Sequence, residues 1–109
     1  MQTFSKEFRL TSKQDFANLK EGSTRLSASR LVVYYKVNIL PHARVGFSIS
    51  KRIAKAHLRN RYRRTLKELF RRSDIRNVSV DVLIVVVSPG DLLAQAKDLF
   101  ERIVKNVSK

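Results

Sequence analysis

Residues 44–70 read RVGFSISKRIAKAHLRNRYRRTLKELF, and the spacing of the apolar residues changes within them. The first seven residues alternate between apolar and small or polar side chains, which predicts a strand over 44–50 with one buried face. From residue 57 the apolar side chains recur every three or four positions, which predicts an amphipathic helix over 57–72. A strand therefore leads directly into a helix, and we expect a domain that contains both.

Two further strands are expected, one on each side of this segment. Residues 30–38, RLVVYYKVN, are rich in β-branched and aromatic residues, and the segment 38–43 that follows is broken by Pro41. Residues 78–88, VSVDVLIVVVS, begin with alternation and then become continuously apolar, as a strand in the centre of a sheet does. A loop over 73–77 separates this strand from the preceding helix.

Helices are expected near both ends. A short helix over 12–20 can stop at Gly22, and a final helix over 91–106 follows the Pro-Gly turn at 89–90. The order helix, strand, strand, helix, strand, helix predicts an α+β fold in a single domain over 1–109. We expect a two-layer α-β sandwich, in which helices cover one face of a small sheet.

Positive charge dominates the composition and gathers in one segment. The chain has 23 Lys and Arg against 9 Asp and Glu, a formal charge of +14, and ten basic residues but one acid, Glu68, lie between 51 and 72. Solvated helix faces usually mix both signs, so that neighbouring charges attract. A solvated charged face is the alternative, but the imbalance favours contacts with phosphate groups, which the forked guanidinium of Arg binds well.

The two faces of the predicted strands differ in chemistry. Four apolar residues of the first strand share the face that we expect to cover the core: Leu31, Val33, Tyr35 and Val37. The opposite face carries one aromatic ring, Tyr34. Three basic residues are expected on the same face: Arg30, Lys36 and Arg44. An aromatic ring for stacking a base, with cations for phosphates, is the usual combination for single-stranded nucleic acid, although an ordinary solvated face is an equal alternative.

Several classes of protein are disfavoured by what the sequence lacks. It contains no cysteine, hence no disulfide and no Cys-ligated metal, which fits a reducing compartment. The N-terminal residues have no hydrophobic signal core, and the longest apolar run, 82–87, is far too short to span a bilayer. We therefore expect a cytoplasmic protein without a membrane partner.

No catalytic residue is expected in this chain. His42 and His57 could in principle act as base and acid in RNA cleavage, but one falls in a predicted loop and the other at a helix start. No cluster of Asp and Glu offers a two-metal site, so no metal ligand is expected either.

Residues 44–70 resemble the signature of the protein subunit of bacterial ribonuclease P. In that family a strand of the form R-x-G-x-x-x-S-K-K/R leads into K-A-x-x-R-N-R-x-K/R-R-x-x-R/K-E. The chain matches this pattern at Arg44, Gly46, Ser50, Lys51, Arg52, Lys55, Ala56, Arg59, Asn60, Arg61, Arg63, Arg64, Lys67 and Glu68. Residues 9–16 resemble the family's N-terminal R-L…D-F element, and residues 81–87 resemble its late strand.

The resemblance implies both a fold and a function. The fold is ribosomal protein S5 domain 2-like, with a small, mostly antiparallel sheet and a left-handed β-α-β crossover through strand 44–50, helix 57–72 and strand 78–88. Family members are protein subunits of a ribonucleoprotein endonuclease that removes the 5′ leader of precursor tRNA. The implied partners are the catalytic RNA and precursor tRNA, with no obligate protein partner. Mg²⁺ is expected in the holoenzyme, held mainly by RNA, and the protein alone binds no cofactor.

The resemblance also implies two sets of binding residues. The catalytic RNA would contact Lys51, Arg52, Lys55, Arg59, Asn60, Arg61, Arg63, Arg64 and Lys67. The cleft that holds the leader would include Phe16, Tyr34, Arg44 and Ser48. Tyr34 and Arg44 also belong to the polar sheet face that alternation alone predicts, so the two arguments agree at these positions.

Two positions depart from the family pattern, and two other functions stay open. Many relatives carry Gly where this chain has Ala54, which would be strained there only if the backbone requires a positive φ. Relatives often carry a second aromatic residue one turn after Phe16, where this chain has Leu19 and Lys20, and this difference predicts weaker stacking of the leader. The alternatives are a structural RNA-binding protein of ribosomal type and, with less support, a peripheral membrane binder.

Overall fold

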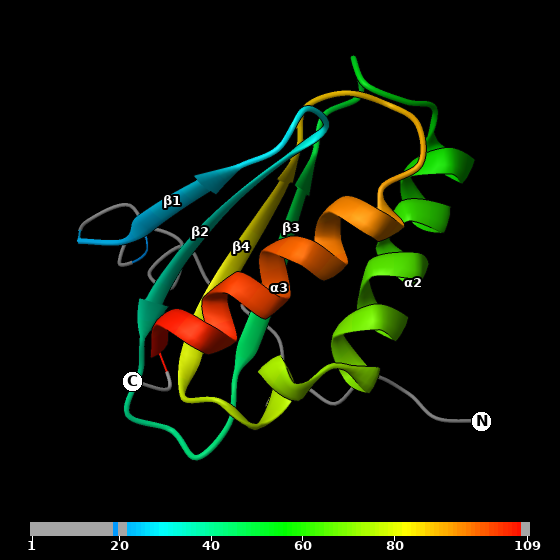
Figure 1. The fold of residues 1–109 in the computed structure, drawn as a ribbon. Helices are drawn as coiled ribbons and strands as arrows, with labels where there is room; N and C mark the ends of the chain where they lie inside the picture. Colours follow the sequence, from blue (N-terminus) through cyan, green and yellow to red (C-terminus); the bar gives the residue numbers. More distant parts are fainter. Residues whose placement is uncertain (1–18, 20–21, 108–109) are drawn as a thin grey trace.

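The computed structural model describes Leu19 and residues 22–107. Within these residues the elements in chain order are β1 (Thr24–Ser27), β2 (Leu31–Val37), β3 (Arg44–Ile49), α2 (Ala56–Arg72), the short 3₁₀ helix η2 (Asp74–Asn77), β4 (Val80–Val86) and α3 (Leu93–Val107) (Figure 1). The helix predicted over 12–20 lies outside the described residues, apart from Leu19.

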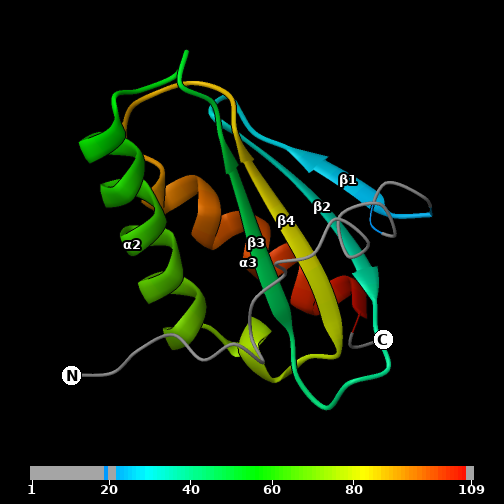
Figure 2. The same ribbon diagram turned by 180° about the vertical axis from the view of Figure 1, so that it is seen from behind.

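The strands form one mixed sheet in the order β1-β2-β4-β3. β1 pairs with β2 and β2 with β4 in antiparallel orientation, whereas β3 and β4 are parallel. α3 lies across one face of this sheet, and α2 packs against α3 beside the β3 edge (Figure 1, Figure 2). The predicted α+β sandwich with a mostly antiparallel sheet is confirmed, and neither helix covers the opposite face.

The connection from β3 through α2 to β4 is left-handed. Seen from the helix side, as in Figure 1, β3 and β4 both run upward and β4 lies to the left of β3. About 98% of connections between parallel strands are right-handed, because strand twist and helix handedness favour that route. Here the residues between β3 and α2 redirect the chain before the helix begins. The left-handed crossover implied by the resemblance is therefore confirmed.

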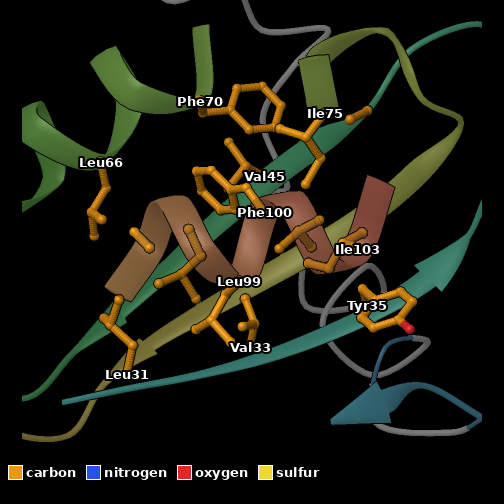
Figure 3. Close-up of a cluster of buried hydrophobic side chains, with 14 of the residues drawn as sticks. Leu31, Val33, Tyr35, Val45, Leu66, Phe70, Ile75, Leu99, Phe100 and Ile103 are labelled. Atoms are coloured by element: carbon orange, nitrogen blue, oxygen red, sulfur yellow. The ribbon is translucent and has the colours of Figure 1, made fainter. Parts of the chain in front are cut away.

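The main hydrophobic core lies between the sheet and the helices (Figure 3). The strands contribute Leu31, Val33, Tyr35, Val45, Ile49, Val80, Val82, Ile84 and Val86. The helical elements contribute Leu66, Phe70, Ile75, Leu92, Ala96, Leu99, Phe100 and Ile103. The rings of Phe70 and Phe100 meet edge to face with their centroids 6.2 Å apart, a favourable aromatic geometry that fixes α2 against α3.

The burial expected for the apolar face of β2 is confirmed at its first three apolar positions and wrong at the fourth. Leu31, Val33 and Tyr35 are buried, but Val37 is 62% exposed. The reason is the length of α3. Its residue Asn106 already reaches the hydroxyl of Tyr35 at 3.1 Å, so Val37, two residues farther along β2, lies beyond the end of the helix.

Two elements lie where the sequence predicts no regular structure. β1 pairs with the first residues of β2 and extends the sheet on the side away from β3. η2 occupies most of the predicted loop 73–77 and buries Ile75 in the core. The strands predicted over 30–38, 44–50 and 78–88 and the helices predicted over 57–72 and 91–106 are confirmed, with ends shifted by two residues or fewer.

Candidate nucleic-acid interface

α2 separates an apolar side from a basic side. Leu66 and Phe70 are fully buried in the core, and Tyr62 packs partly against it. Arg61 and Arg64 are exposed on the rest of the helix. Because the apolar stripe fixes the rotation of α2, these arginines must face away from the core. The predicted amphipathic helix is confirmed, and its apolar contacts are what orient its charges.

The residues predicted to contact RNA form one stretch from the end of β3 through most of α2, and we call them the basic segment. Its exposed members are Lys51, Arg52, Lys55, Asn60, Arg61 and Arg64. Its partly buried members are Arg59, Arg63 and Lys67. The guanidinium of Arg63 donates to the side-chain oxygen of Asn60 at 3.4 Å, so part of the segment is ordered by its own contacts.

The connection that leads into α2 is a compact turn. The backbone N–H of Ile53 donates to the carbonyl of Ser50 at 3.0 Å, and the N–H of Arg52 donates to the hydroxyl of Ser50 at 3.1 Å. Ala54 in this turn is buried. In the part of the chain that the structure describes, no residue other than glycine has a positive φ. The turn therefore accommodates Ala54 without the backbone strain that a positive φ would impose.

The N-terminal end of α2 is positively charged in two ways. Its first turn contains no acidic residue, and Lys55 at the N-cap makes no capping hydrogen bond through its side chain. The helix dipole adds a partial positive charge at this end. The guanidinium of Arg59 donates to the carbonyl of Ala54 at 2.8 Å, which holds this cation beside the helix end. Backbone N–H groups and cations together favour binding of an anion here.

Among the described residues, the acid nearest in sequence to the exposed cations of the basic segment pairs with arginines outside that segment. Glu68, the one acid between 51 and 72, forms salt bridges with Arg71 at 2.5 Å and Arg72 at 3.4 Å, near the C-terminal end of α2. Arg61 and Arg64 take part in no salt bridge with any other described residue. Exposed guanidinium groups that form no salt bridge with a described carboxylate are suited to phosphate.

A pocket of about 430 Å³, which we call the sheet pocket, opens on the face of the sheet that α3 leaves uncovered. Its described lining consists of Leu19, Tyr34, Ser48, Leu83 and Val85. The strand register explains this grouping. Tyr34 lies opposite Leu83 and Ser48 lies opposite Val85, and directly opposed residues point to the same face of a sheet.

Two of the four residues predicted for the leader cleft, Tyr34 and Ser48, meet in the sheet pocket. Phe16 lies outside the described residues. Arg44 lies opposite Asp81 and is not among the residues that line the pocket. Its guanidinium donates two hydrogen bonds to the carboxylate of Asp81, at 2.9 and 2.7 Å. The charge of Arg44 is therefore already balanced by a carboxylate.

Three residues that line the sheet pocket were not predicted to bind a ligand. Leu83 and Val85 belong to the apolar run 82–87, and a run that is apolar on both faces is expected where one face meets the core and the other lines a pocket. That signal marks both faces of β4 as apolar, but it does not distinguish a face that packs against other side chains from one that lines a pocket. Leu19 is 2% exposed and packs against Leu83. Leu19, one of the two residues where the resemblance implies an aromatic ring in relatives, therefore lines the pocket with an aliphatic side chain.

Arg25 of β1 is a further basic residue on the face that carries the sheet pocket. The register pairs Arg25 with Tyr34, so the two side chains point to the same face. Arg25 is exposed, and β1 is the edge strand of the sheet on this side. No pattern in the sequence indicates this residue, because β1 itself is too short to be predicted.

The expectation that Arg30 lies beside Tyr34 is wrong. The backbone N–H of Arg30 donates to the side chain of Gln95 in α3 at 2.9 Å. The Arg30 side chain packs against Gly90, where an added Cβ would lie 2.2 Å from its Nε, and the φ of Gly90 is +134°. Arg30 precedes β2, so strand alternation does not control its direction, and it joins the end of the sheet to the start of α3.

The histidines lie on different elements. His42 precedes β3, with its Nδ1 3.0 Å from the carbonyl oxygen of Ala43, whereas His57 is exposed in the first turn of α2. Across Leu19 and residues 22–107, no three His, Cys, Asp or Glu side chains gather in a group that could hold a metal ion. Over the same residues, no helix has the length and apolarity needed to cross a membrane.

Comparison with known sequences points to one family. A family model described as Ribonuclease P matches residues 4–109. The chain is 36% identical over 91 residues to the ribonuclease P protein component of Legionella pneumophila (strain Corby), covering 83% of this chain and 77% of the relative. It is 33% identical over 90 residues to that of Citrifermentans bemidjiense, with coverages of 83% and 78%. With the protein of Coxiella burnetii it shares 33% identity over 105 residues, with coverages of 94% and 84%.

Solved structures show the same fold. The RNase P protein of Staphylococcus aureus superposes with a TM-score of 0.75 at 24% identity, covering 91% of this chain and 94% of that one. The RNase P protein of Thermotoga maritima superposes with a TM-score of 0.68 at 21% identity, with the same coverages of 91% and 94%. The fold agrees with what the family model and the sequence relatives indicate, and the chain belongs to the family of bacterial ribonuclease P protein components.

Proposed function

We propose that this chain binds the catalytic RNA of ribonuclease P through the basic segment and the 5′ leader of precursor tRNA through the sheet pocket. The RNA then cleaves the precursor endonucleolytically, which removes the leader and leaves the mature 5′ end of the tRNA. The protein contributes binding and orientation to this reaction. It works in the cytoplasm and requires no obligate protein partner.

The observation that carries this proposal is the presence of two surfaces with different chemistry. The basic segment offers exposed cations that Glu68 does not neutralise, which suits the dense phosphates of a folded RNA. The sheet pocket offers an aromatic ring, a hydroxyl group and aliphatic walls, which suit unpaired bases. In Figure 2 the face of the sheet opposite α3 is seen with α2 beside β3, so one bound RNA assembly can reach both surfaces.

The leader half of the proposal depends mainly on Tyr34. Its ring is half-buried in the sheet pocket, so one part is held by the protein and another part is open for stacking. The Ser48 hydroxyl can exchange hydrogen bonds with a base or a ribose. Arg44 does not line the pocket and is paired with Asp81, so the proposal gives it a contact with a leader phosphate only where the leader runs past the pocket along β3.

The proposal assigns the cleavage chemistry to the RNA. Mg²⁺ ions held mainly by RNA oxygens would activate the attacking water and stabilise the leaving oxygen. His42 precedes β3 and His57 follows it, so the length of the strand separates them. This separation supports the view that the two histidines do not act together as base and acid. No protein side chain is therefore assigned as base, acid or metal ligand.

Identification of the bound RNA tests the proposal directly. We expect the protein purified from its own cells to carry one dominant RNA, and that RNA to cleave precursor tRNA in the presence of Mg²⁺. Protein freed of RNA should cleave nothing. Recovery of ribosomal RNA as the main bound species would overturn the proposal in favour of a structural ribosomal role.

A paired variant tests the basic segment itself. Changing Arg61→Ala together with Arg64→Ala removes two charge-assisted contacts, each contributing about 1.5–3 kcal/mol to RNA binding. Affinity for the catalytic RNA should fall, and its salt dependence should become shallower by about one counterion per lost contact. The matched control is Lys97→Ala with Lys105→Ala, which removes two exposed charges from α3. An equal loss in both pairs would show that only net charge matters.

A further inference from the structure

A second pocket, of about 400 Å³, lies between α2 and the start of α3, and we call it the junction pocket. α2 contributes residues at successive positions along one side of the helix: Leu58, Arg61, Tyr62 and Thr65. The chain that enters α3 contributes Gly90, Asp91, Leu92 and Leu93. This pocket is separate from the sheet pocket, with which it shares no lining residue.

Backbone contacts fix the walls of the junction pocket. The N–H of Gly90 donates to the hydroxyl of Tyr62 at 3.1 Å, which ties the α3 lead-in to α2. The N–H of Leu93 donates to the Asp91 carboxylate at 3.1 Å, which shapes the start of α3. Gly90 also packs against Arg30, and its φ of +134° is a backbone conformation that residues with a Cβ rarely adopt. The pocket is therefore part of the packed structure at this end of the molecule.

The lining combines an apolar surface with one charge of each sign. Leu92 lines the pocket with a buried side chain. Leu93 lines it with a side chain that is 46% exposed, which is unusual because most large apolar side chains of the described residues are buried. Arg61 and Asp91 are both exposed. A ligand that matches this surface has a flat apolar body, a negative group for Arg61 and N–H donors for Asp91. An unstacked nucleotide has all three, since its base offers apolar faces and amino or imino hydrogens beside a phosphate.

We propose that the junction pocket receives one unpaired nucleotide of the RNA that binds the basic segment. The base packs against Leu58 and Leu93, its phosphate meets Arg61, and a base amino or imino group donates to Asp91. This inference rests on the proposed function, because it assumes that α2 binds the catalytic RNA. It adds recognition of an extruded base to a surface that otherwise attracts phosphates of any sequence.

The variant Leu93→Ser tests the inference, because it removes the apolar contact and no charge. Leu93 is exposed at the first position of α3, so we expect the thermal unfolding midpoint to stay close to that of the unchanged protein. Affinity for the catalytic RNA should fall roughly fivefold, the lower end of the effect of losing one base contact. The salt dependence of RNA binding should remain the same, in contrast to the variant that combines Arg61→Ala with Arg64→Ala. The control Ala94→Ser alters an exposed neighbour that does not line the pocket and should bind normally.

Chemical probing of the catalytic RNA at nucleotide resolution identifies the occupant. In the complex with the unchanged protein, one unpaired base should be protected, and it should become reactive again with Leu93→Ser. Unchanged affinity and unchanged protection for Leu93→Ser would overturn the inference. If the Arg61→Ala and Arg64→Ala pair still weakened RNA binding in that case, the proposed function would stand and only the junction pocket would lose its role. If that pair had no effect either, the proposed RNA-binding surface itself would fail.

Discussion

Tyr34 and Tyr35 are neighbours in β2, yet they belong to opposite faces of the sheet. Tyr35 is 7% exposed in the core, and its hydroxyl accepts a hydrogen bond from Asn106 of α3 at 3.1 Å. Tyr34 is only half-buried and lines the sheet pocket with Ser48 and Leu83. The face that packs against α3 needs side chains that fill space, whereas the opposite face keeps a ring available for a ligand. The same residue type therefore serves stability at one position and binding at the next.

The largest expected effect belongs to the covered face. Replacing Phe100 with Ala should lower the free energy of unfolding by about 3–5 kcal/mol, because it opens a cavity in a packed core. Phe100 is 1% exposed and its ring contacts that of Phe70. Denaturant unfolding measures the loss. A loss below about 1 kcal/mol would mean that the core repacks and that the contact between α2 and α3 is not essential.

Tyr34→Ala should have the next largest effect, on binding rather than on stability. Loss of one stacked base costs about 1–3 kcal/mol, so the affinity of the holoenzyme for precursor tRNA should fall accordingly. Affinity for mature tRNA and for the catalytic RNA should not change, because neither uses the sheet pocket. Equal weakening for precursor and mature tRNA would show that Tyr34 is structural and that the leader binds elsewhere.

Removal of one hydroxyl group sharpens the comparison between the two tyrosines. Tyr35→Phe leaves Asn106 without its partner and should lower the free energy of unfolding by about 0.5–1.5 kcal/mol, with precursor binding intact. Tyr34→Phe is the matched control. It keeps the ring in the pocket and should leave both stability and precursor affinity nearly unchanged. A larger stability loss for Tyr34→Phe than for Tyr35→Phe would reverse the assignment of the two faces.

The smallest effect is expected at the edge of the sheet face opposite α3. Arg25 lies opposite Tyr34 and is exposed, so Arg25→Ala should weaken precursor binding by less than about 1 kcal/mol, as is usual for a solvated ionic contact. The loss should disappear at high salt and with precursors whose leader is too short to reach β1. Lys97→Ala on α3 provides the control for a single lost charge. Identical losses for both variants at every leader length would remove Arg25 from the leader path.

The elements that the sequence predicts are those that bury one side along their whole length. β2, β3, α2 and α3 each place several apolar residues against the core, so their periodicity is strong. β1 has the sequence TRLS, of which only Leu26 packs partly against the core, and four residues do not reveal a period. At Val37 the period is clear but the burial is not predictable. Its position in the alternation is correct, yet α3 meets β2 only as far as Tyr35.

The candidate site was predictable in so far as it depends on charge and alternation. The excess of cations over Glu68 marks the basic segment, and alternation alone places Tyr34 on the sheet face opposite the main core. Leu83 and Val85 could not be assigned in the same way, because an apolar run looks the same whether its second face meets other side chains or lines an open pocket. Arg30 lies at a strand end, where alternation no longer determines direction.

The sheet order β1-β2-β4-β3 has a consequence for how this chain folds during synthesis. β2 and β3 follow each other along the chain but do not pair, because β4 inserts between them after α2 has been made. Consecutive strands pair in roughly two-thirds of cases, so a non-native hairpin through residues 38–43 competes until β4 leaves the ribosome. Such long-range pairing makes folding slow. The arginine-rich helix therefore emerges before the domain can close, and we expect it to meet cellular RNA while the chain is still incomplete.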